Sequence, residues 1–319
     1  MSRRAVLVLG AGELGMAVLR GLLNHKDIFK VSVLLRASTV NKGPDGDTRL
    51  AELKSLGIES FIAGDIQEDS DTSLASTFAE FDIVVGCTGF LGGPGTQTKL
   101  ARCAIEASDR RQKEFRYVPW QFGVDYDILS HGKSLGLFDE QCSVRDLLRS
   151  TASGDRLSWT IVSTGIFTSF LFEDAFGVVE RQQGGAVVIV RALGDWDVEI
   201  TTTTVEDIGT LTAAILQGFD ENRDRVVFVA GETISYGRLA DVVEGYLAAK
   251  KVSVRRERWD LERLQEALRD QPDDALKKYR VIFGGKEGIA WPASQNYNVR
   301  RGISVQNVSG WLQKKQPFA

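Results

Sequence analysis

Short apolar runs alternate with segments of helical apolar spacing along the first half of the chain. The first run, Val6–Leu9, leads directly into apolar residues at helical spacing between Leu14 and Leu23. Further strand-like runs are Val31–Leu35, Glu59–Ile62, Phe81–Cys87, Arg116–Val118 and Trp159–Val162. Helices are predicted over Thr48–Leu56 and Gln97–Ala107, and a loop over Gly43–Gly46. This alternation predicts an α/β fold with a doubly wound parallel sheet, covered on both faces.

After Thr164 the pattern changes to shorter and more mixed segments. The runs Val187–Val190 and Val198–Thr203 predict a small antiparallel pair joined through Gly194-Asp195. Helices are predicted over Val205–Leu216, Leu239–Ala249, Leu261–Ala267 and Val305–Lys314, and a strand over Val226–Ala230. We therefore expect one domain over residues 1–163 and, over 164–319, mainly a smaller interleaved substrate lobe, with 205–231 returning to the first domain. A substrate cleft is expected between the two.

The composition is that of a globular protein. Of the 319 residues 43% are hydrophobic, enough for a large core, and the formal charge is −4. Acidic and basic residues are interspersed, so we expect no nucleic-acid or membrane surface and a small molecule as partner. The apolar runs are far shorter than the ~20 residues that span a bilayer, and MSRR leads straight into the first strand. We expect a cytoplasmic monomer or homodimer.

Cysteine usage agrees with a reducing compartment. Cys87, Cys103 and Cys142 are odd in number, widely spaced and without a CxxC pair. A disulfide framework or a zinc site is therefore not expected, and we predict no metal site. Cys87, within an apolar strand, is expected to fill the core and not to act as a nucleophile.

The glycines Gly10, Gly12 and Gly15 stand in GxGxxG spacing between the first strand and the first helix. Gly10 permits a sharp exit from the strand, Gly12 lets backbone N–H groups approach a pyrophosphate, and Gly15 lets the helix pack closely on the strand. The anion would lie at the helix N-terminus, in the turn that includes Glu13 and Leu14. We interpret this turn as the dinucleotide-binding turn of a Rossmann fold; the alternative is a merely tight strand-to-helix turn.

Arg36 ends the second strand, where NAD-binding Rossmann units carry an acidic residue for the ribose 2′-hydroxyl. A guanidinium there, followed by Ser38, Thr39 and Lys42, suits a 2′-phosphate and favours NADPH/NADP+ over NAD(H). The alternative is that Arg36 and Lys42 are solvated loop charges.

Two later segments are also expected at the cofactor. Asp65 follows the third strand and is placed along the adenine, or alternatively is a turn residue. Thr88 and Gly89 follow the fourth strand at the carboxyl edge of the sheet, where ligands bind in open α/β folds.

Several motifs together resemble a known family. GAGELG, Arg36, YVPWQFGVDYD (Tyr117–Asp127), VSTGIFTSF (Val162–Phe170) and VEDIG (Val205–Gly209) are similar to the NmrA-like and isoflavone-reductase-like branch of atypical short-chain dehydrogenases, nearest its fungal aromatic-alcohol-reductase-like and secondary-metabolism members. The resemblance implies a Rossmann core, a small C-terminal substrate lobe and bound NADPH. It also implies that Thr88, Ser163, Thr164, Gly165 and Phe167 contact the cofactor. Residues 119–123 and the phenylalanines after Thr164, including Phe170, would line the cleft.

The chain departs from this family at the catalytic position. No Tyr-x-x-x-Lys occurs on the helix after the fifth strand, and the lysine that the isoflavone-reductase group carries there is replaced by Gln141. Glutamine can hydrogen-bond a carbonyl or an oxyanion but cannot release a proton. Gln141 is thus a candidate for substrate or cofactor contact, or alternatively an ordinary surface amide.

Another group would then have to supply any proton. The candidates are His131 and Lys133, in the loop before that helix, and Tyr126. Their ordinary alternatives are a solvated histidine, a surface charge and a structural tyrosine. Trp120, Gln121 and Phe122 follow the fifth strand and are expected to be walls of the cleft or, alternatively, to pack in the core.

The sequence thus leads to one main functional hypothesis and two alternatives. The main one is an NADPH-dependent oxidoreductase that reduces a carbonyl, an imine or a conjugated alkene of an aromatic or alkaloid-like secondary metabolite. The first alternative is a non-catalytic NADP(H)-sensing regulator of the NmrA type, suggested by the missing lysine. The second is an NADP(H)-bound biosynthetic enzyme that performs a redox-neutral rearrangement.

Overall fold

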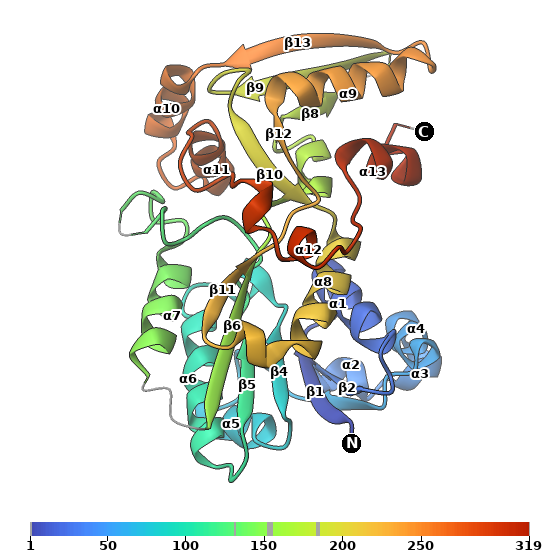
Figure 1. Ribbon diagram of the computed structural model, residues 1–319, viewed down its shortest axis with the longest axis vertical. Coiled ribbons are helices and arrows are strands. Elements are labelled where there is room, and N and C mark those ends of the chain that lie inside the picture. Colours follow the sequence, from blue (N-terminus) through green and yellow to red (C-terminus); the bar gives the residue numbers. More distant parts are fainter. Residues whose placement is uncertain (1, 131, 152–155, 183–185, 319) are drawn as a thin grey trace. The chain divides into compact units, whose positions relative to one another are not determined.

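The computed structural model describes residues 2–130, 132–151, 156–182 and 186–318 (Figure 1). Three segments make up the first of two units: from the N-terminus to Gln121, Glu140–Val162 and Ile208–Val227. The second unit consists of Phe122–Asp139, Ser163–Asp207 and Phe228 to the C-terminus.

A parallel sheet forms the centre of the first unit. Within the described residues it has seven strands: β1 (Arg4–Leu9), β2 (Phe29–Leu35), β3 (Ser60–Ala63), β4 (Ile83–Gly86), β5 (Phe115–Val118), β6 (Leu157–Ser163) and β11 (Arg225–Phe228). Their order is β11-β6-β5-β4-β1-β2-β3, and β1 is paired in parallel with both β2 and β4. This order reverses direction at β1, so the predicted doubly wound α/β fold is confirmed.

Helices cover both faces of this sheet (Figure 1). They are α1 (Glu13–Leu23), α2 (Ala37–Val40), α3 (Gly43–Gly46), α4 (Thr48–Leu56), α5 (Asp71–Phe78), α6 (Thr96–Asp109), α7 (Asp139–Ser150) and α8 (Val205–Gln217), with the 3₁₀ turns η1 (Gly89–Gly92) and η3 (Phe219–Asn222). Because both faces are covered, Val6–Leu9 is fully buried and apolar at every position. The loop expected at Gly43–Gly46 is wrong, because Pro44 in its first turn favours the helical turn α3.

α1 and α8 cross at two glycines. A Cβ on Gly21 would lie 2.2 Å from the carbonyl oxygen of Gly209, and a Cβ on Gly209 would lie 2.1 Å from that of Ala17. Only glycine allows the two backbones to come this close. The glycine of the VEDIG motif is therefore explained by helix packing.

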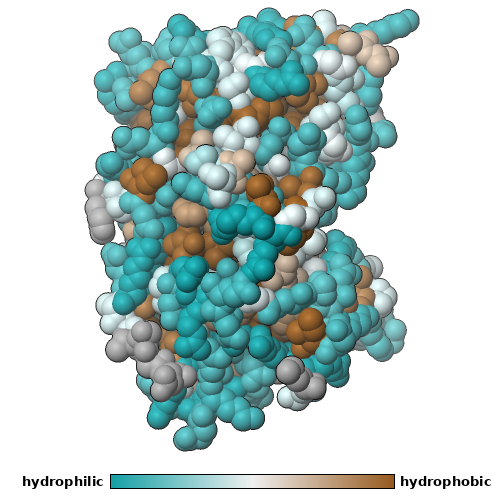
Figure 2. Space-filling view, in the orientation of Figure 1, coloured by the Kyte–Doolittle hydropathy of each residue, from teal (hydrophilic) through white to brown (hydrophobic). Residues whose placement is uncertain are grey.

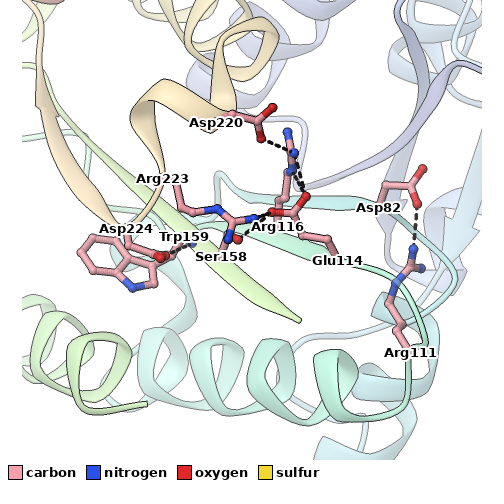
Figure 3. A network of polar contacts seen from close by, with 9 residues as sticks. All are labelled: Asp82, Arg111, Glu114, Arg116, Ser158, Trp159, Asp220, Arg223 and Asp224. Carbon is pink, nitrogen blue, oxygen red and sulfur yellow. Dashed lines mark hydrogen bonds and ion pairs between the residues drawn. The ribbon is translucent and has the colours of Figure 1, made fainter. Parts of the chain in front are cut away.

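A polar network lies at the amino ends of β5 and β6 (Figure 3). Arg116 Nη2 is 2.7 Å from both Glu114 Oε2 and Asp220 Oδ1, and its guanidinium lies over the ring of Phe219. Ser158 Oγ donates to Glu114 at 2.8 Å, and Arg223 pairs with the same carboxylate. The network connects η3 to the start of two central strands.

Two small sheets form the second unit. One, in the order β12-β10-β7, contains β12 (Glu232–Ser235), β10 (Glu199–Thr203) and β7 (Ile166–Phe167). The other, in the order β13-β9-β8, contains β13 (Ser253–Trp259), β9 (Val187–Leu193) and β8 (Val179–Arg181). The remaining elements are η2 (Thr168–Phe172), α9 (Tyr236–Ala248), α10 (Leu261–Asp270), α11 (Ala275–Phe283), η4 (Ala293–Gln295), α12 (Tyr297–Arg300) and α13 (Val308–Lys315).

The antiparallel pair predicted for Val187–Val190 and Val198–Thr203 is wrong, because β9 and β10 belong to different sheets. Gly194, with a φ of 76°, donates its N–H to the carbonyl of Trp259 at 2.8 Å, so β9 stays with its parallel partner β13 to the end. The chain then turns, and β10 pairs with β12 and β7. The glycine ends one sheet and does not form a hairpin.

Residues 122–139, which the sequence prediction included in the first domain, are part of the second unit. The N–H of Asp125 donates to the carbonyl of Gly288 at 2.8 Å, and the rings of Phe138 and Tyr279 are in edge contact with centroids 5.6 Å apart. These contacts are with residues remote in sequence, which the local pattern does not indicate.

Hydrophilic residues cover most of the face of each unit that Figure 2 shows. Among the described residues, no helix combines the length and the apolar character that crossing a membrane requires.

Candidate functional site

The glycine turn after β1 has the geometry that its sequence predicts. Gly10 has a φ of 94°, in the region that favours glycine. A Cβ on Gly15 would lie 2.2 Å from the carbonyl oxygen of Gly10, so α1 can approach β1 only with glycine there. A Cβ on Gly12 would have no atom within 4 Å. Gly12 therefore faces open space, where a ligand can approach the backbone.

This open space belongs to a cavity of about 360 Å³ at the carboxyl ends of the central strands. Its lining residues are Gly10, Gly12, Leu34, Leu35, Arg36, Thr39, Arg49, Gly64, Asp65, Ile66, Gln67, Cys87, Thr88, Gly92 and Thr96. They come from the ends of β1, β2, β3 and β4 and the loops that follow them, from α2 and η1, and from the first turns of α4 and α6. All of them belong to the first unit.

The N-terminus of α1 opens on the cavity at Gly12. Gly12 is the N-cap residue and offers no side chain to the first turn of the helix. The backbone N–H groups of that turn and the helix dipole therefore favour an anion in front of them. Of the other predicted turn residues, Leu14 is buried in the core and Glu13 is exposed, so neither side chain belongs to the cavity lining.

Two arginines line the opposite part of the cavity. Arg36 is the N-cap residue of α2, and its Nε lies 3.4 Å from Oδ2 of Asp65. Arg49 lies in the first turn of α4 and has no carboxylate within ion-pair distance among the described residues. Sequence reasoning missed Arg49; the available signal was Asp47, whose side chain caps α4 and so marks where that helix begins.

The residues predicted beside Arg36 divide into two groups. Thr39 lines the cavity, whereas Ser38 and Lys42 are exposed and are not among the lining residues. Asp65 lines the cavity and also accepts a hydrogen bond from the N–H of Gln67 at 2.9 Å. It is therefore both a turn residue and a wall of the site.

The cavity wall continues past β4. Thr88 lines it, and the Thr88 hydroxyl oxygen is buried and has no hydrogen-bond partner among the residues that the structure describes. Burial raises the pKa of the adjacent Cys87 thiol, which keeps this cysteine protonated and unreactive. Gly89, with a φ of 60°, has the indole of Trp120 3.5 Å from where its Cβ would be.

Gln141 lies in the first turn of α7, and only 1% of its surface is exposed. Within the described residues, neither its amide nitrogen nor its amide oxygen has a hydrogen-bond partner. Gln121 holds this turn: its Nε2 donates to the backbone carbonyl of Gln141 at 2.9 Å, and its Oε1 accepts from Arg145 Nε at 2.7 Å. Gln121 is itself fully buried.

The two predicted proton donors that the structure describes, Tyr126 and Lys133, belong to the second unit. Lys133 is exposed and its ammonium is 3.1 Å from Glu287 Oε2. Tyr126 is buried, with its ring in edge contact with Phe138 and its hydroxyl oxygen 2.3 Å from where a Cβ of Gly123 would be. His131 lies outside the described residues.

The residues expected from the family motif VSTGIFTSF also belong to the second unit, as does Phe122. The N–H groups of Thr164 and Gly165 both donate to the carbonyl of Gly123 at 2.9 Å. Gly165, with a φ of 70°, would place a Cβ 2.0 Å from the carbonyl of Thr201. This is a tightly bonded turn that leads into β7.

The aromatic residues of this motif lie beside the same turn. Phe167 ends β7, and the ring of Phe170 stacks on that of Phe176 with centroids 4.7 Å apart. Ser163 and Phe122 are buried in the same unit. Contact of these residues with cofactor or substrate stays a prediction.

A doubly wound parallel sheet, whose first strand ends in a glycine turn facing a cavity at the carboxyl edge, defines a Rossmann-fold protein. The model of the NmrA-like family matches residues 2–285, and the chain belongs to that family. The resemblance drawn from the sequence motifs is thereby confirmed.

Relatives agree with this assignment. A protein of Gibberella moniliformis (strain M3125 / FGSC 7600) described as an NmrA-like family domain-containing oxidoreductase is 40% identical over 313 residues, which cover 96% of each chain. Among solved structures, an isoflavone reductase has a TM-score of 0.75 at 16% identity and covers 98% of this chain and 100% of its own. A leucoanthocyanidin reductase from Vitis vinifera, solved as a binary complex with NADPH, has a TM-score of 0.73 at 18% identity, covering 97% and 98%.

Proposed function

We propose that this protein is an NADPH-dependent oxidoreductase. The observation that carries the proposal is the cavity in which the glycine turn and the guanidiniums of Arg36 and Arg49 meet. A phosphorylated dinucleotide requires an anion site for its pyrophosphate and cations for its 2′-phosphate. The cavity offers both, and the unpartnered Thr88 hydroxyl on its wall can bond a further polar group. The residues therefore fit NADPH, which when bound would supply the hydride.

Each group in this cavity has its own role in the proposal. The N–H groups at the start of α1 bind the pyrophosphate, and Gly12 leaves them accessible. Arg49, which has no carboxylate partner among the described residues, binds the 2′-phosphate directly, while Asp65 holds Arg36 in the same cavity. These residues bind and orient the nucleotide, and none of them needs to transfer a proton.

We propose an aromatic or alkaloid-like secondary metabolite as the substrate, with a carbonyl, an imine or a conjugated alkene as the group reduced. The names of the relatives support a reductase, since the 40% identical protein is called an oxidoreductase and both structural neighbours above are called reductases. The second unit contains a cluster of aromatic rings, in which the half-buried Phe170 contacts Phe176 and Tyr279. Aromatic rings in such contacts suit an aromatic ligand.

Gln141 is our candidate for a polar contact at the reacting end of the site. Its buried amide can donate and accept hydrogen bonds, but it cannot release a proton. The proton that carbonyl reduction requires therefore comes from Tyr126, Lys133, His131 or water. Tyr126→Phe and Lys133→Met test the two described side chains, with turnover as the readout and nucleotide affinity as the control.

Calorimetric titration of the nucleotide-free protein tests the proposed cofactor. We expect NADPH to bind at least about tenfold more tightly than NADH, because a hydrogen bond to a charged group contributes about 1.5–3 kcal/mol. With aromatic aldehydes, ketones and enones as acceptors, we expect consumption of NADPH. Equal affinity for the two nucleotides would contradict the cofactor assignment.

The second candidate function is a non-catalytic NADP(H) sensor. It is favoured by Gln141, which does not titrate, and by Lys133, which is paired with Glu287. A sensor would bind oxidised and reduced nucleotide with different affinities, consume neither with any acceptor, and associate with a partner protein in a manner that depends on the nucleotide. A redox-neutral enzyme would instead yield a product equal in mass to its substrate.

A further inference from the structure

Two buried glutamines carry amide atoms without hydrogen-bond partners. Gln97 is 3% exposed and Gln141 is 1% exposed. Gln97 Oε1 and both amide atoms of Gln141 have no hydrogen-bond partner in the described part of the chain. Roughly nine in ten buried polar groups in folded proteins are paired, because an unpaired group retains its full desolvation penalty. Three unpaired atoms on two neighbouring elements indicate a polar ligand.

The structure brings these two glutamines together. The backbone N–H of Thr98 donates to Glu140 Oε1 at 2.9 Å, which joins the first turns of α6 and α7. Gln97 and Gln141 are the immediate sequence neighbours of that pair. Gln97 and Gln141 therefore stand on adjacent helix turns, and their unpartnered atoms show that their amides are not bonded to each other.

Both glutamines are held in position through other atoms. Gln97 Nε2 donates to the carbonyl of Gly89 at 3.0 Å, and the main-chain carbonyl of Gln141 accepts from Gln121 at 2.9 Å. Thr96 and Thr88, which adjoin Gln97 and Gly89 in sequence, line the nucleotide cavity. The first turn of α6, which carries Gln97, therefore borders this cavity through Thr96, and the first turn of α7 is bonded to it.

The chemistry of the unpartnered atoms restricts the ligand. Gln97 Oε1 can only accept a hydrogen bond, whereas the amide of Gln141 both donates and accepts. A phosphate or carboxylate has no hydrogen to give to Gln97, and a hydrocarbon satisfies neither residue. A hydroxyl or a carboxamide donates and accepts at once. In a nicotinamide dinucleotide, the half that carries the nicotinamide contains both, as ribose hydroxyls and as the ring carboxamide.

We propose that Gln97 and Gln141 together bind the nicotinamide riboside half of NADP(H), through a group that both donates and accepts hydrogen bonds. The proposal rests on the proposed function, because it presumes that this cavity takes NADP(H). It assigns a role to Gln97 and makes the two glutamines positioning residues for the reacting ring of the cofactor.

The test compares two ligands that share the adenosine half. NADP+ carries the nicotinamide riboside, and 2′-phosphoadenosine 5′-phosphate lacks it. We expect Gln97→Met and Gln141→Met to weaken NADP+ binding by about threefold to tenfold each, the range of one lost neutral hydrogen bond, and to leave binding of the shorter nucleotide unchanged. Gln112→Met, at an exposed position of the same unit, is the matched control and should change neither affinity.

An analogue of NADP+ in which an acetyl group replaces the carboxamide identifies the contacted group. If the glutamines bind the carboxamide, the wild-type protein binds the analogue more weakly than NADP+ and the two variants remove this difference. If they bind ribose, the variants weaken the analogue and NADP+ equally.

The inference is overturned if both variants bind NADP+ like the wild-type protein, or if they weaken the shorter nucleotide as much as NADP+, since the effect would then be a general disturbance of the cavity. A general disturbance is not expected in Gln141→Met, because the hydrogen bond from Gln121 to the main-chain carbonyl of residue 141 does not involve the substituted side chain. Failure of the wild-type protein to bind either nucleotide would instead refute the proposed function, and this inference with it.

Discussion

At the scale of single residues, the nucleotide cavity depends on which side chains reach it and on where a glycine leaves space. Arg49 reaches the cavity from α4, whereas Lys42, which is nearer to Arg36 in sequence, does not line it. Gly12 and Gly15 belong to one turn but serve different purposes: one leaves space for a ligand and the other permits backbone contact.

Arg49→Met is expected to reduce the affinity for NADPH by about tenfold or more and to leave the weaker affinity for NADH nearly unchanged. The reason is that Arg49 has no other charged partner in the part of the chain that the structure describes, and that hydrogen bonds to phosphate are charge-assisted. Lys42→Met is the matched control and should have little effect on either affinity. Titration calorimetry of both variants decides the matter, and a larger effect at Lys42 would contradict our assignment.

Gly12→Ala and Gly15→Ala are expected to affect different properties. The Cβ at position 12 meets nothing within 4 Å, so thermal stability should be nearly unchanged while NADPH affinity falls, because the methyl group fills the space in front of the helix N-terminus. The Cβ at position 15 would lie 2.2 Å from a backbone oxygen, so stability should fall by roughly 1–3 kcal/mol. Melting curves and calorimetry separate the two effects. Equal stability losses would argue against this division.

At the scale of elements, two sets of contacts hold the last segment of the first unit in place. The polar network around Arg116 connects η3 to β5 and β6 (Figure 3). The glycine crossing joins α1 to α8. Both devices fix the segment 208–227 against the sheet, although it follows most of the sheet in sequence. The first unit therefore depends on these contacts to bind its last segment to the sheet.

The stability of the network is expected to depend on pH through Glu114. Burial pushes the pKa of Glu114 up, but hydrogen bonds from Arg116 and Ser158 and the charges of Arg116 and Arg223 outweigh it, so the pKa lies below its ordinary value of 4.5. Since folding lowers this pKa, the folded state binds fewer protons. The contribution of Glu114 is thus complete above its ordinary pKa and is lost as the pH falls through the lowered value.

Glu114→Gln is accordingly expected to lower the urea midpoint near neutral pH and to flatten its decline between about pH 5 and about pH 3. Glu80→Gln serves as the control, because Glu80 is exposed and has no ion pair among the described residues. Parallel pH profiles for the wild-type protein and Glu114→Gln would show that the network does not titrate as described.

Gly209→Ala is expected to lower stability by roughly 1–3 kcal/mol, because its Cβ would lie 2.1 Å from the carbonyl oxygen of Ala17. Gly245→Ala, in α9, is the matched control, since a Cβ there meets nothing within 4 Å. That change should stabilise the protein by about 0.4–1 kcal/mol through higher helix propensity and lower entropy of the unfolded chain. Thermal or urea unfolding measures both, and a stable Gly209→Ala variant would refute the close crossing.

At the scale of the whole molecule, the chain passes between the two units several times. It leaves the first unit after residue 121 and returns to it for residues 140–162 and again for residues 208–227. The segments 122–139, 163–207 and 228 onward belong to the second unit. Neither unit corresponds to one continuous stretch of sequence, so no single cut separates them.

A fragment of residues 1–163 is therefore expected to be largely insoluble. It lacks α8 and β11, which leaves the apolar face of α1 around Gly21 exposed and β6 without its outer neighbour. Soluble yield and near-ultraviolet circular dichroism, compared with the full chain, measure this. A fragment that is soluble and shows fixed tertiary structure would mean that the first unit does not need its last segment.

Local signals explain which parts of this fold the sequence could predict. Strands such as Val6–Leu9 are apolar throughout because the sheet is covered on both faces, and the glycine turn is specified by adjacent residues. By contrast β13, with the sequence SVRRERW, carries arginines that pair with acidic residues elsewhere, such as Arg256 with Asp241 and Glu244 of α9. Its strand character depends on pairing with β9, which no local pattern records.

The candidate site also has parts that the local sequence predicts and parts that only the folded structure shows. The glycine turn and Arg36 were predictable because strand, turn and helix are consecutive. Arg49 and Gln97 were not, because they reach the cavity region from α4 and α6 only after the chain has folded back over the sheet. Gln141 could be suspected from its place in the family motif, but its unpaired amide required the three-dimensional structure.

The late position of α8 and β11 also bears on how the protein is made. A ribosome delivers the chain from its N-terminus, so six strands of the central sheet emerge before the seventh exists. Until that segment follows, the partly assembled sheet has an open edge and an uncovered helix. The nascent chain should therefore need chaperone protection for much of its synthesis.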